Sequence, residues 1–242
     1  MKIGLIGFGR LGQLISKYLV KDFSLFIFDQ KKDYEKDIHL LGAQAASFID
    51  VSKCDIIILS IPISNFEHCV RDLSKSIKKD SIVIDVCSVK ETPIQIMKEF
   101  LPKDVQILGT HPMFGPDSVG DSLSSAKMAL CRERVEEKTY QKIKNYLKSL
   151  DLQVLETTAT DHDKQISRSL LLTHLIGRTL MAFGAEEIDI DTKGYQRLLT
   201  ILEHVGNDSL QLFKDMNNHN KYAKTMISDF SKALQQTIHG LS

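Results

Sequence analysis

The sequence predicts a doubly wound α/β fold with a mostly parallel sheet, followed by an all-helical domain. Up to about residue 158, short apolar runs alternate with amphipathic helical stretches, a pattern typical of a sheet covered by helices on both faces. A glycine-rich turn joins the first run to the first helical stretch. From about residue 159 only helical periodicity remains, and no proline follows Pro116. We therefore expect two domains, residues 1–158 and residues 159–242.

Composition narrows the class of protein and its partners. Lys+Arg and Asp+Glu are equal at 31 each, which argues against a nucleic-acid or membrane-surface partner. The 4 cysteines form no CxxC pair and no metal-ligand spacing, so we expect reduced thiols, no metal site and a cytoplasmic location. No apolar run approaches the ~20 residues of a transmembrane helix. A strand that starts at Met1 leaves no room for a leader peptide.

The first apolar run, 3–6, leads without a break into a glycine motif and then into an amphipathic helix. A GxGxxG spacing between a strand and a helix indicates dinucleotide binding. The first glycine permits the tight turn, the second lets a pyrophosphate approach the backbone, and the third lets the helix pack on the strand. The helix N-terminus then favours the phosphates. The predicted cofactor-binding residues of this Rossmann-type turn are Gly7, Phe8, Gly9, Arg10, Leu11 and Gly12.

A second predicted strand, 24–28, ends at Asp29. An acidic residue there accepts both ribose hydroxyls of the adenosine and repels a 2′-phosphate, which favours NAD as the cofactor. Lys31 and Lys32 lie just beyond it and would serve a 2′-phosphate, so NADP stays open. A chance cluster of glycines in an ordinary βα turn is the alternative. The two strands, the helix and Asp29 together favour dinucleotide binding.

Further apolar runs predict strands at 55–61, 81–86 and 105–108, with helices at 65–77 and from Thr92-Pro93 onward. Two more strands, 127–131 and 153–155, flank a helix at about 136–150 and extend the sheet. Ligands of an open α/β sheet bind at the carboxyl ends of its strands. We therefore expect one crevice lined by the residues that follow such ends: Gly7, Ser60, Ser88 and His111. Ser60 and Ile61 are expected to contact the cofactor.

His111 lies in the stretch 109–118, after the strand predicted at 105–108. Pro112 biases His111 toward an extended backbone, and Gly115-Pro116 is a turn signal. We therefore predict a stiff loop that holds His111 at the end of the strand as a catalytic base.

The second half predicts three helices, at about 161–183, 192–216 and 222–238. Three helices of this size barely form a core alone, so we expect a homodimer through this domain. His174 lies mid-helix among apolar residues, where a histidine is more often a core residue than a ligand. Asp208 is interpreted as a solvated acid or a local cap. The other histidines are expected at the surface or at helix ends: His39, His68, His162, His204, His219 and His239.

Five stretches, in order along nearly the whole chain, resemble the prephenate/arogenate dehydrogenases, most of all the plant-type arogenate dehydrogenases. They are GFGRLGQ from Gly7, DVCSVK from Asp85, THPMFGPDS from Thr110, THLIGR from Thr173 and DTKGY from Asp191. The resemblance implies a reaction of tyrosine biosynthesis, the oxidative decarboxylation that makes tyrosine or its keto-acid precursor. It also implies that His111 removes the hydroxyl proton of a cyclohexadienol. Ser88 would hydrogen-bond the imidazole or the substrate hydroxyl and so fix the tautomer. The carbinol carbon then releases hydride to a nicotinamide, and the ring carboxylate leaves as CO2.

The same resemblance places a substrate-contacting histidine at His174 and a substrate-binding acid at Asp208. That acid would pair with the ammonium of L-arogenate, where prephenate offers only a ketone. L-arogenate is therefore the expected substrate, and prephenate, giving 4-hydroxyphenylpyruvate, is the alternative. Thr200 stands where many bacterial members carry a substrate-binding arginine, and Leu170 where plant-type members have glutamine. The candidates to bind the substrate carboxylates instead are Ser118, Arg178, Thr192 and Lys193.

Two other functions stay open. A dehydrogenase of β-hydroxyacids or imines with this architecture would carry a catalytic lysine or aspartate on the first long helix. Lys164 is the nearest lysine there, and no motif supports it. A non-catalytic NAD(H)-sensing subunit would need no base, so that any meeting of Ser88 and His111 would be accidental.

Overall fold

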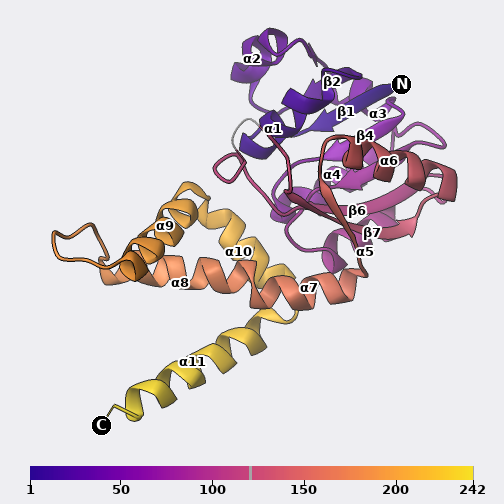
Figure 1. Ribbon diagram of the computed structural model, residues 1–242. Coiled ribbons are helices and arrows are strands. Elements are labelled where there is room, and N and C mark those ends of the chain that lie inside the picture. The colour runs from indigo at the N-terminus through magenta and orange to yellow at the C-terminus, as the bar shows by residue number, and fades with distance from the viewer. Residues whose placement is uncertain (120–121, 242) are drawn as a thin grey trace. The chain divides into compact units, whose positions relative to one another are not determined.

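The computed structural model describes residues 1–119 and 122–241, which divide into two compact units, Met1–Thr160 and Asp161–Ser242 (Figure 1). The first unit contains the sheet and the second is helical. The strands are β1 (Lys2–Ile6), β2 (Ser24–Phe28), β3 (Gln44–Ala45), β4 (Ile56–Leu59), β5 (Ile82–Asp85), β6 (Gln106–Pro112), β7 (Lys127–Arg134) and β8 (Gln153–Glu156). The helices of the first unit are α1 (Arg10–Leu19), α2 (Glu35–Leu40), α3 (Phe48–Ser52), α4 (Phe66–Ser74), α5 (Glu91–Phe100) and α6 (Glu137–Ser149), with 3₁₀ turns η1 (Lys32–Tyr34) and η2 (Ile63–Asn65).

The eight strands form one sheet in the order β3-β2-β1-β4-β5-β6-β7-β8. All neighbours from β3 to β6 pair in parallel, β7 is antiparallel to β6, and β8 is parallel to β7. From β1 the chain first builds toward β3 and then returns to add β4 onward on the other side. This reversal opens a crevice above the carboxyl ends of β1 and β4. The predicted doubly wound, mostly parallel sheet is confirmed.

Each face of the sheet packs against its own set of helices. Ile56 and Ile58 of β4 belong to an apolar cluster that includes side chains of α1 and α6. Ile57 and Leu59 belong to a second cluster, with side chains of α4 and α5. Because successive strand residues point to opposite faces, and both faces are covered, β4 is apolar throughout.

The segment between β2 and β4 contains elements that the sequence analysis did not predict. α2, β3 and α3 are 6, 2 and 5 residues long, which is too short for a periodic pattern to show. α3 begins with a capping box. The Oγ of Ser47 accepts from the N–H of Asp50 at 3.1 Å, and the Asp50 carboxylate accepts from the N–H of Ser47 at 3.2 Å. This reciprocal cap is the local signal that could have located the helix.

In the second unit, two of the three predicted helices are wrong in length. The elements are α7 (Ala159–Arg168, which begins at the end of the first unit), α8 (Leu170–Phe183), α9 (Lys193–Asn207), α10 (Leu210–His219) and α11 (Ala223–His239). The helix expected at 161–183 is interrupted at Ser169, where φ is −115° and ψ is −85°. The helix expected at 192–216 is interrupted at Asp208-Ser209, and the Oγ of Ser209 accepts from the N–H of Leu212 at 3.1 Å to begin α10. Apolar periodicity continues across both interruptions, so it did not reveal them.

The helical unit has a small apolar core. The buried residues that form it are Leu171, Met216, Ala223 and Met226. Large apolar side chains stay exposed on its helices, at Met181, Phe183, Leu198, Leu210, Leu234 and Ile238. A core of this size contributes little stability by itself. The unit therefore has apolar surface in excess of what its own helices cover.

Acid should destabilise the first unit through carboxylates whose pKa is lowered in the folded state. The Lys78 ammonium and the N–H of Lys2 hold the pKa of Asp55 below its ordinary value. This contribution to stability is present above the unfolded pKa, near 4, and is lost as the pH falls through the lower folded pKa. Because Asp55 is partly exposed, we expect at most about 1 kcal/mol from it.

The measurement is the midpoint of thermal unfolding between pH 6 and pH 2, for the wild type and for Asp55→Asn. The variant should lose part of the acid dependence below pH 4 while keeping the rest, which other carboxylates supply. An unchanged acid dependence in Asp55→Asn would contradict this assignment. The other carboxylates with lowered pKa are Asp50, Asp72, Glu137 and Glu156.

Candidate active site

The carboxyl ends of four adjacent strands form one row across the sheet. Ile6 of β1 pairs with Leu59 of β4, Leu59 with Asp85 of β5, and Asp85 with Gly109 of β6. The residues just beyond this row carry the predicted functional groups: Gly7, Ser60, Ser88 and His111. The pairing therefore brings all four to the same edge of the sheet, as the sequence predicts.

The glycine turn after β1 is packed so closely that two of its glycines cannot be replaced without strain. Gly7 has φ +100°, and a Cβ built on it would lie 2.2 Å from the carbonyl oxygen of Ser60. A Cβ on Gly12 would lie 2.2 Å from the carbonyl oxygen of Gly7. A Cβ on Gly9 would meet no described atom within 4 Å. Gly7 and Gly12 are thus required by the fold, whereas Gly9 leaves open space at the helix N-terminus.

A cavity of about 560 Å³ lies beside this turn, within the first unit. Gly7 and Gly9 line it together with the ends of β2 and β4 and one side of α4. Its other lining residues include Phe28, Asp29, Lys31, Tyr34, Ser60, Ile61, Asn65, His68 and Cys69. The cavity sits at the N-terminus of α1, where no side chain caps the helix at Gly9 and phosphates are favoured. Its size, its glycine-lined opening and Asp29 fit the adenosine half of a dinucleotide.

Asp29 follows β2 and lines this cavity, where the sequence analysis placed it. Its Oδ2 accepts from the N–H of Phe8 at 2.7 Å, and its Oδ1 accepts from the N–H of Lys31 at 2.8 Å. The carboxylate thereby holds the glycine turn against the loop after β2. Each oxygen has a second lone pair for a ribose hydroxyl.

Arg10 and Leu11 lie at the start of α1, and Phe8 is buried below the turn. The guanidinium of Arg10 donates to both carboxylate oxygens of Asp117, at 2.6 and 2.7 Å. Sequence analysis did not predict this ion pair, which joins the glycine turn to the loop after β6. Ser118 lies in the same loop, where its Oγ accepts from the N–H of Gly115 at 2.9 Å.

His111 lies within a strand, and the expected loop position is wrong. β6 continues to Pro112, and His111 pairs with Ala129 of the antiparallel strand β7. The residue is buried, with a fractional exposure of 4%. Ser88 is half-buried in the loop after β5. The functional roles of His111, Ser88 and Ser118 stay predictions.

Sequence analysis missed a buried charged pair beneath this edge. Asp85 ends β5, Lys90 precedes α5, and both side chains are fully buried and form an ion pair. Burial raises the pKa of Asp85, against the opposing effect of the Lys90 ammonium. The signal available in the sequence was an acid directly after the apolar run 82–84.

In the helical unit, His174 of α8 is buried, and its Nε2 lies 3.4 Å from the Oδ2 of Asp208. The ring stacks on Phe213 with centroids 6.2 Å apart. Arg178 donates to the carbonyl oxygen of Asp208 at 3.0 Å, and its guanidinium also lies over Phe213. The structure thus brings together His174, Arg178 and Asp208, which the sequence analysis considered separately.

Thr192 and Lys193 lie at the start of α9. Thr192 is the N-cap of α9, and its Oγ1 accepts from the N–H of Tyr195 at 3.2 Å. Lys193 is exposed in the first turn of the same helix. The substrate-binding roles of these two residues, and of His174 and Asp208, stay predictions.

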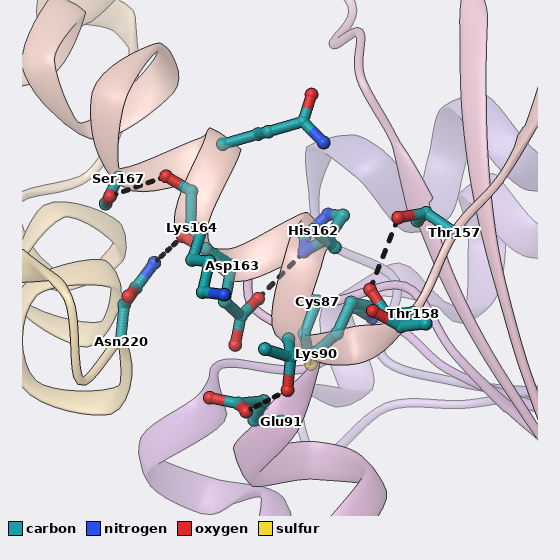
Figure 2. Close-up of polar contacts among 12 residues, drawn as sticks. Cys87, Lys90, Glu91, Thr157, Thr158, His162, Asp163, Lys164, Ser167 and Asn220 are labelled. Atoms are coloured by element: carbon teal, nitrogen blue, oxygen red, sulfur yellow. Dashed lines mark hydrogen bonds and ion pairs between the residues drawn. The ribbon is translucent and has the colours of Figure 1, made fainter.

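His162 was expected at the surface or at a helix end; it lies in the first turn of α7, and it is buried. Its Nδ1 lies 2.8 Å from the Oδ1 of Asp163, and Asn220 donates to the carbonyl oxygen of Asp163 at 2.8 Å (Figure 2). These contacts tie the first turns of α7 to the segment before α11. His162 lies in a polar helical stretch, and the sequence pattern does not indicate that Asp163 is its buried partner.

The described residues contain neither a metal-ligand cluster nor a membrane-spanning helix. No group of three or more His, Cys, Asp or Glu side chains could hold a metal ion among residues 1–119 and 122–241. Within the same ranges, no helix has the length and hydropathy needed to cross a membrane.

The chain is similar to known proteins over most of its length. A family model described as prephenate dehydrogenase, nucleotide-binding domain, matches residues 26–156, more than half of the chain. A second model, described as TYRAAT1-like, C-terminal domain, matches residues 179–242. Arogenate dehydrogenase 1, chloroplastic, of Arabidopsis thaliana is 30% identical over 244 residues, which cover 97% of this chain and 38% of that protein. The chain therefore spans less than half the length of this relative.

Solved structures share the fold. The arogenate dehydrogenase of Synechocystis superposes with a TM-score of 0.73 at 20% identity, covering 99% of this chain and 91% of that one. The prephenate dehydrogenase of A. aeolicus, in complex with hydroxyphenyl propionate and NAD+, gives a TM-score of 0.79 at 20% identity, covering 98% and 88%. With the match over residues 26–156, these findings place the chain in the prephenate dehydrogenase family.

Proposed function

We propose that the protein catalyses the oxidative decarboxylation of L-arogenate to L-tyrosine, with a nicotinamide dinucleotide as hydride acceptor. The observation that carries the proposal is the position of His111. It lies at the carboxyl end of β6, on the same sheet edge as the glycine turn after β1. The arogenate dehydrogenase of Arabidopsis, similar over 97% of this chain, supports the substrate.

His111 would act as the base. A neutral imidazole takes the proton of the ring hydroxyl while the carbinol carbon loses hydride, which oxidises that carbon to the carbonyl level. The bond to the ring carboxylate then breaks and CO2 leaves. The electron pair of that bond stays in the ring and makes it aromatic. The phenolate oxygen takes up a proton, so the imidazolium can return the one it accepted. Such proton transfer is worth roughly 10²–10⁴-fold in rate.

Ser88 would donate to or accept from the imidazole or the substrate hydroxyl, which orients the ring that His111 presents. When bound, a nicotinamide dinucleotide would supply the electrophilic carbon that accepts the hydride. The residues proposed to hold it are those of the glycine turn, Asp29, Ser60 and Ile61. Of these, Gly7, Gly9, Asp29, Ser60 and Ile61 line the cavity of about 560 Å³. Asp29 supports NAD, whereas Lys31 in the same lining leaves NADP as the second candidate.

Prephenate is the second candidate substrate, and one observation favours it. Asp208, proposed to pair with the arogenate ammonium, already has His174 as a partner at 3.4 Å. A paired carboxylate opposes a neutral ketone less than an unpaired one does. Ser118, Arg178, Thr192 and Lys193 remain the candidates for binding the substrate carboxylates.

The experiment is steady-state turnover of L-arogenate and of prephenate, each with NAD and with NADP. The proposal predicts the highest kcat/KM for L-arogenate with NAD. Turnover of prephenate alone would support the second substrate. No turnover in any of the four combinations, with cofactor binding intact, would contradict the function and favour a sensing role. A 3-hydroxy acid in a fifth assay tests the β-hydroxyacid alternative.

Asp208→Asn should change the choice of substrate. Removing the carboxylate removes the proposed ammonium partner, so kcat/KM for L-arogenate should fall by about 10–100-fold, the range of a charged hydrogen bond. The value for prephenate should change by less than about 3-fold. Asp229→Asn, at an exposed position of α11, is the matched control and should change neither. An equal loss for both substrates would remove Asp208 from substrate selection.

We also propose that the protein is a homodimer formed through its helical unit. The support is the small core of that unit and the large apolar side chains that its helices expose, Phe183 and Leu234 among them. Sedimentation equilibrium measures the mass directly, and a monomer at micromolar concentration would contradict the proposal. None of the four cysteines forms a disulfide, and the location that we propose is the cytoplasm.

A further inference from the structure

Asp85 and Lys90 form an ion pair in the core of the first unit. Both side chains are fully buried, and Lys90 is among the largest buried side chains of the protein. Taking two charges out of water is costly, and apolar residues of similar volume often give an equal or more stable core. Stability alone therefore does not explain why this position has a buried ion pair.

The contacts of the pair connect β5, the loop after it and β6. The Lys90 ammonium donates to the Asp85 carboxylate and to the carbonyl oxygen of Thr110. Thr110 in turn donates through its Oγ1 to the carbonyl oxygen of Asp85 at 2.6 Å. The N–H of Cys87 donates to the Asp85 carboxylate at 3.0 Å. Cys87 and Lys90 are drawn in Figure 2.

These bonds join residues that flank Ser88 and His111, the two residues proposed for catalysis. The loop 86–89, which carries Ser88, is closed at its two ends by Asp85 and Lys90. The Thr110 carbonyl belongs to the peptide bond that leads directly into His111. One ammonium thus links the Ser88 loop to the backbone of His111, and it does so with directional N–H donors that an apolar side chain lacks.

We propose that Lys90 is a positioning residue, which, through Asp85 and the Thr110 carbonyl, sets the Ser88 loop and the His111 backbone in the relative geometry that proton transfer requires. This inference rests on the proposed function, because it assigns the pair to the same site. A misplacement of about 1 Å can cost 10²-fold in rate. A lysine that only filled the core would affect folding and leave the rate of the folded enzyme unchanged.

The test compares Lys90→Met with the double variant Asp85→Asn/Lys90→Met. Lys90→Met leaves the Asp85 carboxylate buried without this partner and should lower both thermal stability and kcat. The double variant removes both charges of the pair and should regain stability. It should still show a kcat about 10–100-fold below wild type, with the dissociation constant for NAD within about 3-fold. Lys78→Met, at an exposed ion pair with Asp55, is the control and should keep wild-type kcat.

A folded double variant with wild-type kcat would overturn the proposal. So would a loss of NAD affinity as large as the loss of kcat, because it would indicate general damage to the unit. If Lys90→Met does not fold, the double variant alone decides between these outcomes.

A second measurement separates this inference from the proposed function. In protein with ¹⁵N-labelled histidine, the ring signals of His111, assigned by their absence in His111→Asn, should shift in the double variant and stay in place in Lys78→Met. That shift would support the positioning role even if the wild type turned over neither substrate, in which case only the proposed function fails. Unshifted His111 signals would overturn the positioning role whatever the substrate proves to be.

Discussion

Replacing His111 by asparagine should lower kcat by about 10²–10⁴-fold while the protein stays folded and binds NAD. Asparagine is close to imidazole in hydrogen-bonding reach, but it cannot accept a proton near neutral pH. His111 is also paired through its backbone in β6, which the substitution leaves intact. The measurements are steady-state turnover, the midpoint of thermal unfolding and a fluorescence titration with NADH.

The control for this variant is His39→Asn on α2, where the side chain is exposed. It should leave turnover and NADH binding unchanged. Two outcomes would contradict the assignment of His111. One is a kcat within 3-fold of wild type. The other is a lost turnover that simply follows a loss of folded protein.

Alanine substitutions in the glycine turn should separate folding from cofactor binding. A Cβ on Gly7 would lie 2.2 Å from the carbonyl oxygen of Ser60, and one on Gly12 would lie 2.2 Å from that of Gly7. Backbone atoms cannot move away cheaply, and Gly7 also has φ +100°, so each variant should lose roughly 2 kcal/mol or more. At about 2–4 °C per kcal/mol, the midpoint of thermal unfolding should fall by at least about 4 °C.

Gly9→Ala is the matched control for folding, because its Cβ would meet no described atom within 4 Å. Its thermal midpoint should stay within about 2 °C of wild type, whereas its affinity for NADH should fall about 10-fold or more. The added methyl group would occupy the space through which a pyrophosphate approaches the backbone. If Gly9→Ala bound NADH as the wild type does, the phosphates would have to lie elsewhere.

Much of the first unit follows from local signals. The run 24–28 was predicted with the bounds of β2, and the glycine turn was placed between β1 and α1, because apolar runs and turn residues act over a few neighbours. The short elements α2, β3 and α3 escaped because a few residues carry no periodicity. In the helical unit, Ser169 and Asp208-Ser209 interrupt helices whose apolar pattern continues on both sides. Such interruptions depend on local capping interactions, about which apolar periodicity carries no information.

In the candidate site, too, some features follow from local signals and others depend on contacts between distant parts of the chain. The glycine turn, Asp29 and the histidine beside Pro112 can be located without a structure, because the motif and its flanking strand are contiguous. The position of His111 inside a strand depends on long-range pairing, since β6 is extended by pairing with β7, including His111 with Ala129. The burial of Lys90 against Asp85 and Thr110 depends on long-range pairing as well. A lysine is normally a surface residue, and only the adjacency of β5 and β6 supplies the oxygens that hold its charge inside.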